Sequence, residues 1–196
     1  MKISFSTALI TGSSRGLGRA IAVKLAQEGV HRIAVHYLTR RNEAEKTLAL
    51  LRDAGAEGVL VQGDTSNAQR AREIVDEAAR NLGGCNIFVQ SVAPQLDEIY
   101  EHTLATEVPL EKWQLAFDTQ ARAFFVGASA AAKYMGAGGR ILALSYRPGD
   151  KQVAGSRGSV WVRPRRHWRV PAGTSVLRGC SCTERYHRER CQPRCF

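Results

Sequence analysis

The sequence predicts an α/β protein with a doubly wound, parallel sheet. Three observations favour this fold. Short apolar runs alternate with longer segments of helical periodicity, glycines stand where the helices are expected to end, and a glycine-rich turn joins the first run to the first helix. Helices between consecutive strands require parallel crossovers, and right-handed crossovers favour the strand order 3-2-1-4-5. The sheet is expected to stop after about five strands.

The elements follow this pattern along the chain. Residues 6–10 (STALI) form a short apolar run, which predicts a buried strand. Residues 18–28 then place Ile21 and Leu25 on one helical face, and Gly29 suits the end of that helix. The remaining expected elements are strand 32–37, helix 42–54, strand 58–62, helix 67–82, strand 86–90, helix 111–135 and strand 140–144.

Two regions of different composition meet near Asp150. Residues 1–150 contain 17 Lys+Arg and 16 Asp+Glu, whereas residues 151–196 contain 11 Lys+Arg and only 2 Asp+Glu. Nearly all of the net charge of +10 therefore belongs to the tail, which also holds four of the five cysteines and has neither strand nor helix periodicity. We expect a folded domain over 1–150 and an irregular, basic, Cys/Arg-rich tail over 151–196.

Composition excludes several classes of protein. With 196 residues, 44% of them hydrophobic, 18 Gly and 6 Pro, the chain is too apolar for a disordered protein and too poor in glycine for a collagen-like one. The apolar run before the first glycine-rich turn is too short for a signal peptide or a membrane span. A cytoplasmic protein without a membrane partner is expected.

The strongest site signal is the segment TGSSRGLG, residues 11–18, between the first strand and the first helix. Glycine permits a tight turn and a close approach of backbone to a pyrophosphate, and the N-terminus of the next helix offers free N–H groups to that anion. A purely structural turn is the alternative. The residues predicted to bind the cofactor here are Gly12, Ser14, Arg15, Gly16, Leu17 and Gly18.

The pattern TGSSRGLGRAIA, with three residues between its first two glycines, resembles the short-chain dehydrogenase/reductase family of NAD(P)-dependent enzymes with a Rossmann sheet. The resemblance covers residues 4–150. It implies that Asp64, followed by Thr65, contacts the adenine amino group, although an aspartate near a helix start is common for structural reasons. It also implies that the segment after the fourth strand, Ser91, Val92 and Ala93, lines the cofactor site.

The end of the second strand bears on the choice of cofactor. An NAD enzyme usually places an acid there for the ribose 2′-OH, whereas the 2′-phosphate of NADP needs a cation. No acid occurs between Ile33 and Asn42, and the segment offers Arg40 and Arg41 instead. Together with Arg15, these residues favour NADPH over NADH, unless Arg40 and Arg41 are only solvated loop residues.

The substrate side resembles one branch of the family. Residues 90–97 (QSVAPQLD) resemble the H-S-I-A-x-A-P-x-x-Q-L-D segment of enoyl-acyl-carrier-protein reductases, and residues 142–146 (LALSY) resemble their L-T-L-S-Y segment. The resemblance implies site roles for Ser145 and Tyr146, and for Gln120, which stands where other members keep an asparagine in the proton relay. Alternatively, Tyr146 is a half-buried aromatic residue at a strand end.

The resemblance implies an oxidoreductase that reduces an enoyl or 3-oxoacyl thioester, free or bound to acyl carrier protein, or a small carbonyl compound. Reductases of this family use a tyrosine as the acid, together with a lysine four residues later. In the enoyl reductases the spacing between the tyrosine and the lysine is longer. Only Lys151 follows Tyr146, so the pair is missing and we expect this chain to be inactive. The alternative is a noncatalytic dinucleotide-binding protein. Intact family members are homo-oligomers.

A shifted reading frame explains the tail. With suitable synonymous codons, residues 184–196 read from the second base give NGITVNAVSPGV, which resembles the sixth-strand segment of the family. Residues 152–170 read from the third base give GGRQPWVSMGSAKAALES, which resembles the catalytic helix with its lysine. Because the two segments use different frames, two small insertions or deletions are required.

Two other interpretations of the tail remain. The segment RPRRHWR, residues 163–169, has the arginines and the tryptophan that nucleic-acid binding uses. The cysteines and a histidine could ligate zinc, but their spacing is irregular. The thiol and imidazole groups concerned belong to Cys180, Cys182, His187, Cys191 and Cys195. Neither a metal site nor a nucleic-acid partner is expected.

Overall fold

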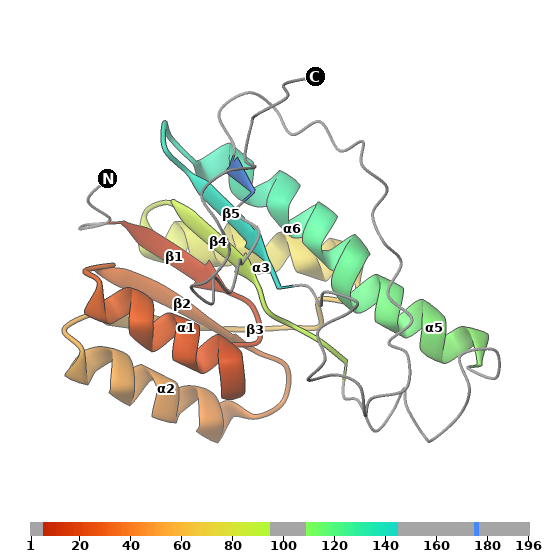
Figure 1. The fold of residues 1–196 in the computed structure, drawn as a ribbon, viewed down its shortest axis with the longest axis horizontal. Coiled ribbons are helices and arrows are strands. Elements are labelled where there is room, and N and C mark those ends of the chain that lie inside the picture. The colour runs from red at the N-terminus through yellow and green to blue at the C-terminus, as the bar shows by residue number, and fades with distance from the viewer. Residues whose placement is uncertain (1–5, 95–108, 145–174, 177–196) are drawn as a thin grey trace, which may run out of the picture.

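The computed structural model describes residues 6–94, 109–144 and 175–176 (Figure 1). Its strands form one parallel sheet in the order β3-β2-β1-β4-β5-β6. The strands are β1 (Thr7–Ile10), β2 (Arg32–Tyr37), β3 (Glu57–Gln62), β4 (Ile87–Gln90), β5 (Arg140–Ala143) and β6 (Ser175–Val176). The α-helices are α1 (Gly16–Gln27), α2 (Arg41–Asp53), α3 (Ala68–Leu82), α5 (Leu110–Phe117) and α6 (Ala123–Ala131).

The predicted parallel sheet and its order 3-2-1-4-5 are confirmed. The structure adds the two-residue strand β6, in the tail, for which the sequence indicated no regular element. Ser175 and Val176 pair with Arg140 and Ile141, so part of the outer edge of β5 is covered. Any extended segment can pair there, because an edge strand presents unpaired N–H and C=O groups whatever the sequence of its partner.

Helices cover both faces of the sheet (Figure 1). Strand residues alternate between the two faces, so Ala8 and Ile10 pack in one core cluster, while Leu9 packs in the other. The first cluster contains Ala22 of α1 and residues of α2, and the second contains residues of α3 and α6. Both faces are buried, which explains why the strands are continuous apolar runs.

The helix expected over 111–135 is not uniform. Between α5 and α6, the segment Asp118–Arg122 is a π-helix, and a 3₁₀ turn, Ala132–Tyr134, ends the run. The side-chain amide Nε2 of Gln90, at the end of β4, donates to the Thr119 carbonyl at 3.2 Å. A π turn inserts about one residue per turn without disturbing the apolar pattern, so hydrophobic spacing cannot reveal it.

Parallel strands place the loops that follow them at one edge of the sheet. The loops after β1, β2, β3 and β4 are therefore neighbours, although more than fifty residues separate the first from the last. The order reverses beside β1, because β2 lies on one side of it and β4 on the other. A crevice at such a point is where open α/β sheets bind ligands.

Candidate functional site

The loop between β1 and α1 can be built only with glycine at three positions. Gly12 and Gly16 have φ angles of +66° and +57°, in the left-handed region. A Cβ on Gly18 would lie 2.4 Å from the carbonyl oxygen of Gly12, which no neighbouring backbone could accommodate. By contrast, a Cβ on Gly16 would meet no atom within 4 Å, so the loop is open on that side.

The N-terminus of α1 faces this open side without a side-chain cap. Its N-cap residue is Arg15, which makes no capping hydrogen bond, and the first turn contains no acidic residue. The first backbone N–H groups of a helix have no partner within the helix, so those of the first turn can bind an anion. In α3, by contrast, the side chain of Asn67 accepts from the Arg70 N–H.

Buried polar contacts hold the glycine loop in place. The Ser13 hydroxyl donates to the Ile10 carbonyl at 2.7 Å and accepts from the His36 N–H at 3.1 Å. Arg19 and Thr47 both donate to the carbonyl of Ser14, at 2.5 and 3.0 Å. These bonds make the loop a fixed surface before any ligand arrives.

The Arg19 guanidinium also pairs with the Glu43 carboxylate at 2.7 Å, which ties α1 to α2. Hydrogen bonds from Lys46 and from Arg19 lower the pKa of Glu43 to about 2. The Glu43 carboxylate is therefore ionised at neutral pH, and two cations, Arg19 and Lys46, neutralise its charge.

The three arginines predicted to bind a phosphate differ in their contacts. Arg41 pairs with Glu45 at 2.9 Å, and this hydrogen bond raises the pKa of Arg41. Arg15 and Arg40 are exposed, and within the described residues neither side chain makes a hydrogen bond or an ion pair. Arg15 directly precedes α1 and Arg40 directly precedes α2, so a cation without a partner among the described residues stands at the start of each of these helices.

Asp64 and Thr65 lie in the loop after β3, at the same edge. The carboxylate Oδ1 of Asp64 accepts from the Ser66 N–H at 2.8 Å, and Thr65 is buried. Asp64 does not cap α3, because Asn67 does. The structural explanation for an aspartate at this position is therefore a turn within the loop rather than a helix cap.

Side chains from three elements bind carbonyl groups at the end of β3 and in the loop that follows it. Arg70 of α3 donates to the Gln62 carbonyl, and His36 of β2 donates to the Gly63 carbonyl at 2.9 Å. Arg122 of the π segment donates to the Ser66 carbonyl at 2.5 Å.

The segment after β4, which includes Ser91 and Val92, packs against the glycine loop. The hydroxyl of Thr11 accepts from the Ser91 N–H at 3.0 Å and donates to Gln90 Oε1 at 2.9 Å. A Cβ on Gly12 would lie 3.2 Å from the Cα of Val92, so the two loops are in close contact. Ala93 follows in the same loop.

The candidate residues on the substrate side are only partly within the described structure. Gln120 lies in the π segment, and its side-chain Nε2 is buried without a hydrogen-bond partner among the described residues. Such an orphaned donor is costly unless a ligand or water satisfies it. Ser145 and Tyr146 lie outside the described residues, as do the candidate zinc and nucleic-acid segments of the tail.

Two residues that contact these loops were not predicted from the sequence. In the sequence, His36 is a single polar residue at the end of an apolar strand, and Arg122 resembles an ordinary charged residue on the surface of a helix. Their roles depend on which loops the sheet order brings beside them. For His36, one feature of the sequence could have indicated a role: it is a histidine in a strand expected to be buried on both faces, where a polar side chain needs partners.

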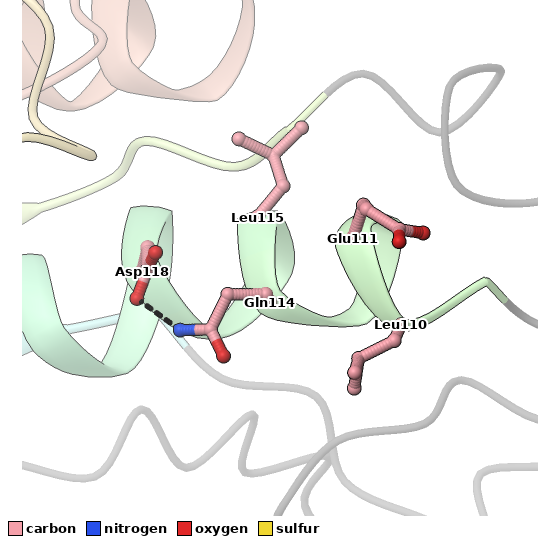
Figure 2. A pocket seen from close by; sticks show the side chains of 5 residues that line it. All are labelled: Leu110, Glu111, Gln114, Leu115 and Asp118. Carbon is pink, nitrogen blue, oxygen red and sulfur yellow. Dashed lines mark hydrogen bonds between the residues drawn. The ribbon is translucent and has the colours of Figure 1, made fainter.

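A hollow lies on α5, away from the glycine loop (Figure 2). It measures about 450 Å³ and is widely open. Gln114 Nε2 donates to Asp118 Oδ1 at 2.7 Å within it. None of the predicted site residues lines this hollow, so it does not belong to the candidate site. Its lining residues are Leu110, Glu111, Gln114, Leu115 and Asp118.

Two other kinds of site were sought in the described part of the chain. There, no cluster of three or more His, Cys, Asp or Glu side chains is arranged to hold a metal ion. No helix of that part is long and apolar enough to cross a membrane.

Comparison with known proteins agrees with this arrangement. A family model described as enoyl-(acyl carrier protein) reductase matches residues 12–159. An uncharacterised oxidoreductase of Methylorubrum extorquens is 31% identical over 144 residues, which are 74% of this chain and 56% of the relative. The 1-cyclohexenylcarbonyl-CoA reductase of Streptomyces collinus is 34% identical over 141 residues, 70% of this chain and 47% of the relative.

A 3-oxoacyl-[acyl-carrier-protein] reductase of Staphylococcus epidermidis is 28% identical over 119 residues, 61% of this chain and 46% of the relative. Among solved structures, a short-chain dehydrogenase of Burkholderia cenocepacia in complex with NADP has a TM-score of 0.66 and 29% identity. The match covers 73% of this chain and 56% of that one. The chain thus spans about half the length of these relatives.

Proposed function

The chain belongs to the short-chain dehydrogenase/reductase family, and on that premise we propose that it binds NADPH at the carboxyl edge of its sheet as a reductase of acyl thioesters. The glycine loop is the observation that carries this proposal. Its three obligatory glycines, its open side at Gly16 and the uncapped N-terminus of α1 fit a pyrophosphate.

The other parts of the cofactor would contact residues on both sides of that loop. Asp64 and Thr65 would contact the adenine, and Ser91, Val92 and Ala93 would lie along the nicotinamide half. Leu17, which is 62% exposed beside Gly16 and Gly18, would cover the dinucleotide from the helix side. Burial of that side chain by a ligand would remove apolar surface from water.

Charge supports NADPH over NADH. Arg15 and Arg40 are exposed cations without partners among the described residues, and no carboxylate stands between Ile33 and Asn42, where one would accept from a ribose 2′-OH. A 2′-phosphate would give both guanidinium groups a charged partner. The Burkholderia cenocepacia structure, which holds NADP, supports the same preference.

The experiment is a titration of the full chain and three variants with NADPH and NADH. We expect Arg15→Ala and Arg40→Ala each to weaken NADPH binding about tenfold, because each removes a charge-assisted contact, and to leave NADH binding nearly unchanged. Arg52→Ala, an exposed arginine at the other end of α2, is the matched control. Equal losses for both dinucleotides in the Arg15 and Arg40 variants would contradict the assignment of the 2′-phosphate site.

The substrate class is proposed from the family model and from two relatives. The model is that of an enoyl reductase, and the relatives reduce, by name, an unsaturated CoA thioester and a 3-oxoacyl thioester. A bound nicotinamide would supply the hydride. The chain would then have to place a donor near the thioester oxygen, where negative charge develops. The unpartnered amide of Gln120 is such a donor within the described residues; Ser145 and Tyr146 are further candidates from the sequence.

A noncatalytic dinucleotide-binding protein is the second candidate. It is favoured by one observation, that only Lys151 follows Tyr146, so the tyrosine and lysine pair of family reductases is missing. Oxidation of NADPH with crotonyl and acetoacetyl thioesters separates the two functions. Turnover above the rate without enzyme supports a reductase, whereas tight NADPH binding without turnover supports the second function.

A further inference from the structure

His36 lies between two of the loops assigned to the cofactor. It stands near the end of β2 and is only 2% exposed. Its ring atom Nδ1 is 3.0 Å from the backbone nitrogen of Gly12, in the loop after β1. Its other nitrogen, Nε2, is 2.9 Å from the carbonyl oxygen of Gly63, in the loop after β3. One side chain therefore bridges the glycine loop and the adenine loop.

The sheet order explains how one ring reaches both loops. Strand β2 lies between β1 and β3, and His36 pairs in register with Val61. The backbone repeats the bridge, because the Ser13 N–H donates to the His36 carbonyl and the Gly63 N–H donates to the Tyr37 carbonyl, both at 3.1 Å. The ring is thus flanked by the first residues of each loop.

The two contacts specify one tautomer of the ring. The Gly12 N–H can only donate, so Nδ1 must be unprotonated and accept. The Gly63 carbonyl can only accept, so Nε2 must carry the proton and donate. A charged imidazolium would place a second donor against the Gly12 N–H.

The surroundings keep the ring neutral. Burial lowers the pKa of His36 to about 4, with smaller contributions from nearby Arg70, which lowers it, and from Asp64 and the Gly63 bond, which raise it. The bridging tautomer is therefore unchanged near neutral pH.

Two other side chains at this edge each bind only one of these two loops. The Thr47 hydroxyl donates to Ser14 in the glycine loop, whereas Arg122 donates to Ser66 in the adenine loop. A dinucleotide spans both loops, so its affinity depends on their separation as well as on each loop separately.

We propose that His36 is a positioning residue, whose ring sets the separation between the pyrophosphate-binding loop and the adenine-binding loop. The proposal rests on the function proposed above. The ring itself does not contact the cofactor in this proposal. It acts through Gly12 and Gly63, which it holds at a fixed separation.

Two substitutions each retain one half of the bridge. In His36→Asn, the side-chain oxygen can stand near the place of Nδ1 and accept from Gly12, but the side chain is too short to reach Gly63. In His36→Gln, the side-chain nitrogen can stand near the place of Nε2 and donate to Gly63, but the acceptor for Gly12 is lost. His31→Asn, at an exposed histidine just before β2, is the control.

The full chain and the variants are titrated with NADPH and with adenosine, which has an adenine but neither a pyrophosphate nor a 2′-phosphate. We expect both His36 variants to weaken NADPH binding about tenfold and adenosine binding less than about threefold, since only NADPH requires both loops at the correct separation. A residue that merely fills the core would weaken both ligands alike. The ¹⁵N shifts of the wild-type ring should report a proton on Nε2 at neutral pH.

Three outcomes would overturn the proposal. The first concerns His36 variants that are folded, as judged by native circular dichroism: they bind NADPH as tightly as wild type does, or they lose affinity for both ligands equally. Another, which needs no variant to fold, is a wild-type ring that is protonated on Nδ1 or charged at neutral pH. The third is wild-type protein that binds no dinucleotide; it overturns the proposed function as well, whereas the first two leave that function intact.

Discussion

His36 also makes the stability of the fold depend on pH. Its pKa is about 4 in the folded protein and near 6.5 when the chain is unfolded, so the unfolded chain binds more protons between these values. The free energy of unfolding should therefore fall as the pH falls from about 6.5 to about 4, by about 3 kcal/mol over the whole window at 1.36 kcal/mol per pKa unit.

Urea unfolding of wild type and His36→Asn at pH 7 and pH 4.5 measures this contribution. The variant lacks the titrating ring, so its stability should change less between the two pH values. Glu43 contributes in a lower window, because its depressed pKa gives stability that is lost as the pH falls from 4.5 towards 2. Parallel stability changes in the two proteins would show that the ring is not buried in its neutral form.

At the scale of elements, the π segment connects the substrate side of the site to the adenine loop. It contains Gln120, and its last residue, Arg122, donates to the Ser66 carbonyl and pairs with Asp118 at 3.0 Å. Gln90, whose Oε1 accepts from Thr11 beside the glycine loop, donates to the Thr119 carbonyl of the same segment. A π turn frees carbonyl groups from the helical pattern, and here a side chain uses one of them.

Arg122→Met should loosen the adenine loop without changing the sheet. The substitution retains an apolar stem of similar length but removes the bond to Ser66 and the ion pair with Asp118. We expect faster amide hydrogen exchange in residues 63–67 and NADPH binding weaker by about three- to tenfold. Lys133→Met, an exposed cation in the 3₁₀ turn, is the control. Unchanged exchange in that loop would mean that other contacts suffice to hold it.

How far the sequence predicts these elements depends on whether their causes are local. The strands were predictable because strands buried on both faces are continuous apolar runs in the sequence. Most helix ends were predictable because a glycine with a positive φ angle, such as Gly29 or Gly83, follows the helix. The π segment was not, because the bond from Gln90 joins residues far apart in the chain. Arg41 pairs with Glu45, whereas Arg40 has Ala44 at the same spacing of four, so the sequence does contain a difference between these neighbours that the prediction of a phosphate site did not use.

At the scale of the whole molecule, the excess of basic charge is concentrated in residues 151–196. Residues 1–150 are nearly neutral, and several of their cations pair with acids, as Arg19 does with Glu43 and Arg70 with Glu73. The match to the family model ends at residue 159, close to the change in composition near Asp150. An excess of basic charge confined to a segment without periodicity supports an out-of-frame origin rather than a nucleic-acid surface.

The last prediction concerns the nucleotides that encode this tail. After about codon 150 we expect two small insertions or deletions, the second between about Arg178 and Glu184. Their removal restores NGITVNAVSPGV and a helix containing SAKAALE. The restored helix supplies a lysine, so the restored protein should oxidise NADPH with a thioester at least about a hundredfold faster than this chain, the usual contribution of positioned acid–base groups. Both proteins should bind NADPH, because the glycine loop is common to them. An uninterrupted frame, together with tail peptides found by mass spectrometry in the purified protein, would instead make the basic tail a genuine product and require its own explanation.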